Sequence, residues 1–185
     1  MDRFWLLTST FYGNWLPGDP RGFVSRVRQK RPEDPQAAGR REHDTPGTSY
    51  DADMPGLQQA AQQSLRGAPI RLNREQAEVL LKQFQQTAEF RCWSLLAVAI
   101  MANHVHLVVG VTGDPDPTKV LGDFKAYGSR ALTAQWGKPD SGTWWTYAGS
   151  KRKLADEKAV LAAISYVRLQ ANPLIVWLAS ENSGR

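Results

Sequence analysis

The sequence has one cysteine and only three histidines among its 185 residues. A single cysteine cannot form a disulfide within the chain, so a disulfide-stapled fold is excluded and a reducing, cytoplasmic setting is expected. No apolar run approaches the roughly 18 residues that a membrane-spanning helix needs. The N-terminal segment reaches the polar residues Thr8, Ser9 and Thr10 too soon for a signal peptide. We therefore expect no membrane association.

The rest of the composition is that of an ordinary globular protein, with 42% apolar and 22% charged residues. The length predicts a single domain over residues 1–185. Residues 17–69 are rich in Pro, Gly, Gln and charge and poor in large apolar side chains. We interpret them as an insertion with little core of its own, in which residues 58–63 can form a short helix.

Alternating and helical apolar patterns predict the elements outside this insertion. Asn73 and Gln76 have the spacing of a helix capping box, and Asp156 or Ala155 can start the last helix. The predicted elements are strands over 4–12, 92–101, 104–111 and 143–153, a helix that starts after Asn73 and carries apolar residues up to Ala88, a helix over 118–136, and a last helix from 155 or 156 through Gln170. Their order predicts an α+β, ferredoxin-like fold, a split βαβ arrangement in which an antiparallel sheet carries its helices on one face.

Residues 119–153 carry an excess of positive charge. The formal net charge is +5, and residues 119–153 hold seven basic residues against two acidic ones. Aromatic residues are interleaved with them, including Trp144 and Trp145, of which we expect one in the core and the other stacked on a base or under a helix. Such a segment suits a nucleic acid, whose phosphates attract cations and whose bases stack on aromatic rings. A solvated helix face followed by a core strand is the alternative.

Two of the three histidines lie two residues apart at the start of a predicted strand. Side chains at i and i+2 of a strand share one face, so His104 and His106 can chelate one cation or hold one phosphate. Hydrogen-bonded histidines in a core strand are the alternative. A closed zinc site is poorly supported, because zinc hydrolases use three or more protein ligands and His43 lies in the insertion.

The last predicted helix carries a second candidate group. Tyr166 and Gln170 are four residues apart and are expected on one helix face. A tyrosine hydroxyl can act as a covalent nucleophile, and a glutamine carbonyl oxygen can ligate a metal. Arg168 is expected to point elsewhere and to meet a phosphate. Tyr127 is the rival nucleophile, but it lacks a polar residue four positions later.

Together these segments resemble the HUH endonucleases, specifically the small single-tyrosine transposases and the REP-associated tyrosine transposases. The segment 101–109 (MANHVHLVV) is similar to that family's histidine strand, and Tyr166 to Gln170 is similar to its nucleophile helix. Asn172-Pro173 resembles the Asn-Pro pair that often follows in the REP-associated group.

The resemblance implies metal-dependent nicking and transfer of single-stranded or hairpin DNA, with Tyr166 forming a 5′-phosphotyrosine link. It implies that His104, His106 and Gln170 hold Mg²⁺ or Mn²⁺. A homodimer that exchanges the tyrosine helix remains open. The candidate DNA contacts are Arg21, Lys125, Arg130, Lys151, Arg152, Lys153 and Arg168.

Two other functions fit the same residues. The chain could be a DNA-hairpin-binding module of this fold that does not cut, or a metal-dependent phosphodiesterase that uses His104 and His106 without a tyrosine nucleophile.

Overall fold

The computed structural model describes residues 2–16, 19 and 55–179. Its centre is a five-stranded sheet in the order β4-β1-β3-β2-β5, and every neighbouring pair is antiparallel. The strands are β1 (Asp2–Thr10), β2 (Ser94–Ile100), β3 (His104–Thr112), β4 (Ser150–Leu154) and β5 (Ile175–Leu178). The helices of the described residues are α1 (Pro55–Gln63), α2 (Arg74–Phe90), α3 (Pro117–Trp136) and α4 (Glu157–Arg168).

The first four strands and the two helices α2 and α3 form the predicted split βαβ arrangement. β1, α2 and β2 make one half, and β3, α3 and β4 make the other, with β1 and β3 adjacent at the centre. The α+β, ferredoxin-like fold class is therefore confirmed. The fifth strand was not predicted. β5 is only four residues long and exists because it pairs with β2, from Ala97↔Leu178 to Ile100↔Ile175.

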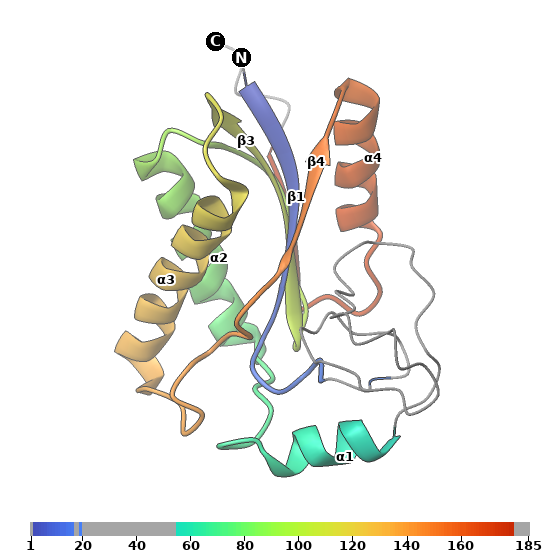
Figure 1. Ribbon diagram of the computed structural model, residues 1–185. Helices are drawn as coiled ribbons and strands as arrows, with labels where there is room; N and C mark the ends of the chain where they lie inside the picture. The colour runs from blue at the N-terminus through green and yellow to red at the C-terminus, as the bar shows by residue number, and fades with distance from the viewer. Residues whose placement is uncertain (1, 17–18, 20–54, 180–185) are drawn as a thin grey trace, which may run out of the picture.

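The helices cover both faces of the sheet, which corrects the prediction that they lie on one face. α2 and α3 lie on one side and α4 on the other (Figure 1). Leu7, Val98 and Leu107 belong to the core under α2 and α3, whereas Ala97 and Val108 belong to a second core with α4. The physical reason is visible in β3, which is buried without interruption from Val105 to Val111. A strand that is apolar on both sides requires cover on both sides.

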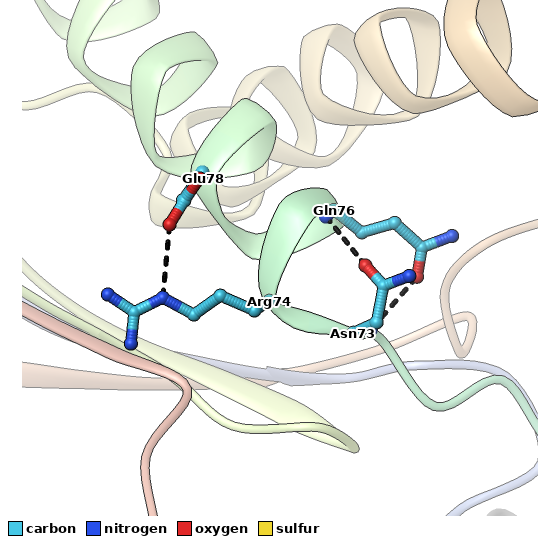
Figure 2. Close-up of polar contacts among 4 residues, drawn as sticks. All are labelled: Asn73, Arg74, Gln76 and Glu78. Atoms are coloured by element: carbon cyan, nitrogen blue, oxygen red, sulfur yellow. Dashed lines mark hydrogen bonds and ion pairs between the residues drawn. The ribbon is translucent and has the colours of Figure 1, made fainter.

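Helix α2 starts at the predicted capping box. The Asn73 side chain accepts a hydrogen bond from the Gln76 backbone N–H at 2.9 Å, and the Gln76 side chain accepts one from the Asn73 backbone N–H at 3.0 Å (Figure 2). Arg74 and Glu78 form an exposed ion pair one turn apart beside it. Helix α4 starts after Asp156, whose carboxylate accepts from the Ala159 N–H at 2.7 Å. Both helix starts are therefore local features of the sequence.

The predicted strand over 143–153 is shorter in the structure. Only β4 is regular, and Trp145 forms an isolated bridge with Phe11. Both tryptophans are buried in the core with α2 and α3, so of the two alternatives expected for the second tryptophan the structure supports packing under a helix and not stacking on a base. Trp144 donates its indole N–H to the Thr133 hydroxyl at 2.9 Å, and Trp145 stacks on Phe11 with ring centroids 4.5 Å apart. The chain leaves strand geometry here, which lets consecutive side chains enter one core.

Most of the predicted insertion over residues 17–69 lies outside the described residues. The described part, residues 55–69, contains α1, which includes the short helix expected over 58–63. Within the part of the chain that the structure describes, no helix combines the length and the apolar character needed to cross a membrane.

Candidate functional site

The two histidines of β3 lie side by side on the face that α4 covers. His104 and His106 alternate with buried Val105 and are in line with Val108, which packs in the core with α4. The two imidazole centroids are 4.9 Å apart and the ring planes are nearly perpendicular, at 87°. The predicted shared face of His104 and His106 is therefore confirmed.

Each imidazole is oriented by a hydrogen bond at Nδ1. His104 Nδ1 lies 2.7 Å from the Asn103 side-chain oxygen, and His106 Nδ1 lies 2.7 Å from the Thr8 hydroxyl. An amide oxygen can only accept, so Nδ1 of His104 carries the proton and the lone pair of the neutral ring is on Nε2. Histidines that bind metals are commonly oriented in this way by a partner at the other ring nitrogen.

Thr8 and Asn103 were not identified from the sequence. Thr8 lies directly opposite His106 in the β1–β3 pairing, 98 residues away in the chain. No sequence signal predicts that register. Asn103 directly precedes His104, inside the segment that carries the family resemblance. That position is the sequence signal that could have identified Asn103.

His106 is neutral at physiological pH. Its side chain is buried, and burial lowers the pKa of His106 from 6.5 to about 4, with a smaller contribution from the charge of His104. A neutral imidazole is the form that donates a lone pair to a cation. The local environment therefore keeps His106 in a ligand-competent state over the pH range in which the protein would work.

Tyr166 of α4 lies against this histidine pair. The centroids of the Tyr166 and His106 rings are 5.2 Å apart, with an interplanar angle of 75°. The tyrosine is 49% exposed, so a substrate can reach it from solvent. The structure thus brings a phenol and two imidazoles together within one chain, although they come from separate elements of the sequence.

The prediction that Gln170 and Tyr166 share one helix face is wrong, because α4 ends at Arg168 and Leu169 is its C-cap. The Gln170 side-chain N–H instead donates to the Tyr166 backbone oxygen at 3.1 Å. This bond keeps Gln170 within one turn of Tyr166. It uses the amide N–H, and the amide oxygen is the atom that can ligate a metal.

The predicted basic run at β4 is divided between the two faces of the sheet. Arg152 is paired with Leu6, which belongs to the core with α4, so Arg152 is on the face that carries the histidines. Lys151 and Lys153 alternate with it and are on the opposite face. All three side chains are exposed. Arg168 is exposed at the end of α4 and lies about 200° around the helix axis from Tyr166.

Lys125 and Arg130 of α3 are on the far side of the sheet from the histidines. The Lys125 ammonium donates to the backbone oxygens of Thr146, Tyr147 and Ala148, at 2.6, 3.2 and 3.3 Å. These bonds use its three protons within the protein, which favours a positioning role over the predicted phosphate contact. Arg130 is exposed and stacks over the Tyr127 ring at 5.0 Å. Arg21 lies outside the described residues.

A metal site at the histidine pair would need donors other than acidic or thiolate side chains from this chain. Among the described residues, no group of three or more His, Cys, Asp or Glu side chains is arranged to hold a metal ion. The two imidazoles fit a cation as a partial site, because both rings are oriented through Nδ1 and His106 is neutral. Oxygen donors such as the Gln170 amide or a bound phosphate would have to complete it.

Comparisons with known proteins were made against families, curated proteins and solved structures. The chain matches no curated protein. One similar structure is a REP-associated tyrosine transposase bound to a REP hairpin, at 11% identity and a TM-score of 0.47, covering 89% of this chain. This chain spans 64% of the length of that protein. A second is a Deinococcus radiodurans protein described as a candidate transposase, at 12% identity and a TM-score of 0.48, covering 93% of each chain.

The family comparison gives a match to the family described as transposase, IS200-like, over residues 70–150. The matched segment runs from the start of α2 to the start of β4 and contains β3 with both histidines. It ends before α4 and therefore does not include Tyr166. Over residues 70–150, the chain is accordingly similar to the IS200-like transposases.

Proposed function

We propose that this protein nicks single-stranded DNA and transfers the cut strand through a 5′-phosphotyrosine intermediate on Tyr166. The observation that carries this proposal is the contact between Tyr166 and His106, whose ring centroids are 5.2 Å apart, beside His104. The similarity of residues 70–150 to the IS200-like transposases supports DNA as the substrate. The described geometry supports the proposal by bringing a half-exposed phenol and two imidazoles together.

Tyr166 is the proposed nucleophile. Its hydroxyl oxygen attacks the scissile phosphorus, the bond from phosphorus to the 3′ oxygen breaks, and the 5′ phosphate becomes linked to the tyrosine. The phenol loses its proton, and the departing 3′ oxygen gains one and becomes a free hydroxyl. One phosphodiester replaces another, so the joint can be reversed onto a second strand without ATP.

His104 and His106 are the proposed holders of Mg²⁺ or Mn²⁺, with Gln170 as a further ligand through its amide oxygen. Such a cation, when bound, polarises the scissile phosphate and offsets charge in the transition state. The Thr8 and Asn103 hydrogen bonds hold the two imidazoles in place before the substrate arrives. Less reorganisation is then needed at the moment of reaction.

The proposed DNA path lies on the α4 side of the sheet. Arg152 shares the face of the histidines and Arg168 ends the helix that carries Tyr166, so both are phosphate contacts in this proposal. Hairpin-bearing single strands are the proposed substrate, following the family resemblance of the two motifs. Lys151 and Lys153 extend from the other side of the same edge strand and would meet DNA only where it passes around that edge.

We also propose that residues 1–185 form one domain in which residues 17–69 are an insertion. β1 precedes the insertion and β3 follows it, and the two strands pair from Asp2↔Thr112 to Thr10↔His104. Pairing along the whole of both strands supports one continuous core on either side of the inserted residues.

The nicking proposal is tested with a labelled DNA hairpin that carries single-stranded tails, incubated with the protein and Mn²⁺. We expect a covalent protein–DNA adduct that survives denaturing electrophoresis and that is lost in Tyr166→Phe. Tyr127→Phe is the matched control, because Tyr127 is the rival tyrosine on the far side of the sheet, and it should leave the adduct unchanged. His106→Ala should reduce adduct formation while hairpin binding remains.

Two results would contradict the proposal in different ways. Hairpin binding with no adduct on any strand would identify a DNA-binding module that does not cut. Release of cut DNA without an adduct, unaffected by Tyr166→Phe, would identify a phosphodiesterase that uses the histidines with water.

A further inference from the structure

Tyr147 is the most exposed large hydrophobic side chain in the described part of the chain, at 97% of its full accessible surface. It was expected in a strand, but it lies in the loop between Trp145 and β4. The ring presents an open aromatic face to solvent, on which an unpaired base can stack. By contrast, the preceding two aromatics, Trp144 and Trp145, are buried in the core.

The backbone that carries Tyr147 is held firmly although its side chain is free in solvent. Lys125 donates to the carbonyl oxygens of Thr146, Tyr147 and Ala148. Gly149 lies so close to β1 that a Cβ there would be 2.6 Å from the Thr8 backbone oxygen. The loop is therefore fixed on both sides of Tyr147. A ring carried on a held backbone loses less conformational freedom on binding than a ring on a mobile loop.

This loop adjoins the histidine end of the sheet. The Thr146 N–H donates to the Thr10 carbonyl oxygen at 3.0 Å, and the two threonine hydroxyl oxygens are 2.8 Å apart. Thr10 lies directly opposite His104 in the β1–β3 pairing. Tyr147 therefore directly follows Thr146, which contacts Thr10. Thr10 in turn pairs with the candidate metal ligand His104.

The surroundings of the loop suit a polyanion. Ser150 begins β4 three residues after Tyr147, and the exposed cations Lys151 and Arg152 follow at once. Lys151 is close enough to Lys125 for its charge to act on it. Cations that hold phosphates beside an exposed aromatic ring form the usual arrangement of a single-strand binding surface, because any base can stack on the ring.

We propose that Tyr147 is a stacking platform for one unpaired base of the DNA strand that enters the histidine–tyrosine site. The proposal rests on the proposed function for its ligand class, single-stranded DNA, and adds a positioning residue from outside the reacting groups. By holding one base at a loop whose backbone is fixed, Tyr147 would set which phosphodiester reaches Tyr166.

The test measures equilibrium binding of a labelled DNA hairpin with thymidine tails in the Tyr166→Phe background, so that cutting plays no part. Tyr147→Ala should weaken binding by about 5- to 100-fold, the usual range for one stacked base. Tyr147→Phe should bind as tightly as the parent. Phe90→Ala is the matched control, because Phe90 is another exposed aromatic, 72% accessible, at the far end of α2, and it should change nothing.

A series of probes with one abasic thymidine position at a time identifies the stacked base. At one tail position, removal of the base should weaken binding to the parent and abolish the difference between the parent and Tyr147→Ala. An equal loss on every abasic probe would mean that Tyr147 acts only through the loop structure, and would overturn the proposal. Equal affinity of Tyr147→Ala and the parent would overturn it as well.

The two proposals fail separately in these experiments. Adduct formation with unchanged binding in Tyr147→Ala would leave the nicking function intact and reject the platform. Position-specific stacking with no adduct in the unmodified protein would support the platform and reject nicking. A protein that binds neither tailed hairpins nor single strands would reject both.

Discussion

Thr8 and His106 face each other across β1 and β3, and the hydrogen bond between them connects the two central strands of the sheet to the candidate site. The bond is short, at 2.7 Å, and one of its partners is buried. A buried ring nitrogen that loses its partner costs about 1–3 kcal/mol. At the residue scale, the orientation of the imidazole therefore depends on a hydroxyl that has no chemical role of its own.

Replacing Thr8 with valine tests this dependence. Thr8→Val keeps the β-branched shape but cannot bond to His106 Nδ1, so we expect the Mn²⁺ concentration for half-maximal adduct formation to rise about 10- to 100-fold. The measurement is the adduct yield over an Mn²⁺ titration. Thr112→Val, at the exposed opposite end of β3, is the control. An unchanged Mn²⁺ dependence in Thr8→Val would show that this bond does not prepare the site.

Lys125 makes a second prediction at the residue scale, about stability and pH. Burial, and to a lesser degree the charge of Lys151, lower the pKa of Lys125 from 10.5 to about 8. Between these two values the unfolded chain keeps the proton and the folded protein has released it. The folded state binds fewer protons there, so the free energy of unfolding contributed by Lys125 rises with pH across this window.

Urea unfolding of the parent and of Lys125→Met at a series of pH values measures this effect. The free energy of unfolding of the parent, relative to that of Lys125→Met, should increase from pH 8 towards pH 10.5. The same replacement at Lys119, an exposed lysine of α3, is the control. A difference between the parent and Lys125→Met that does not vary with pH would contradict the assignment.

At the scale of elements, β4 joins the sheet through a close approach at Gly149. A Cβ at this residue would be 2.6 Å from both the Thr8 backbone oxygen and the Leu121 side chain. A backbone oxygen in a paired strand cannot move without disturbing the pairing. The start of β4 and the position of Thr8 are therefore coupled to one glycine.

Gly149→Ala is expected to lower the free energy of unfolding by about 1–3 kcal/mol, because the added methyl group has no space. Gly122→Ala is the matched control in α3, since nothing lies within 4 Å of its added Cβ. That change should raise the free energy of unfolding by roughly 0.5–1 kcal/mol through the helix preference of alanine. Urea denaturation measures both, and equal stabilities of the two variants would contradict the close approach.

At the scale of the whole molecule, one chain assembles the candidate site by covering the second face of its sheet. α4 packs on Ala97, Ala99 and Val108, and β5 then pairs with β2 of the same chain. The packing of α4 and the pairing of β5 thereby hold the half-exposed Tyr166 beside its own His106. An exchange of α4 between two chains would require β5 to leave β2 as well.

A mixing experiment tests whether the site is formed within one chain. His106→Ala and Tyr166→Phe are each expected to lack adduct formation, and an equimolar mixture should lack it too, because neither chain holds both groups. Recovery of the adduct in the mixture would show that a tyrosine from one chain serves the histidines of another. A mixture of the parent with either variant is the control for inhibition.

Much of the arrangement could be predicted from sequence because it depends on neighbours in the chain. The capping box of Asn73 and Gln76 involves residues three apart, and the shared face of His104 and His106 follows from the alternation of a strand. Tyr166 was identified in the same way, from its position in a helix and a family resemblance. The predicted last helix extended to Gln170, two residues beyond its observed end at Arg168, because the apolar pattern continues past that end.

Other features depend on which distant segments meet, and only the tertiary structure decided them. The sequence by itself determined the order of the elements, the helix starts and the two imidazoles on one face. The fold decided that α4 covers the opposite face from α2 and α3, that Thr8 meets His106, that β5 exists, and that Lys125 binds the loop of Tyr147. The physical reason is that periodicity and capping act within a few residues, whereas strand register and burial are fixed only when separate segments compete for the same core.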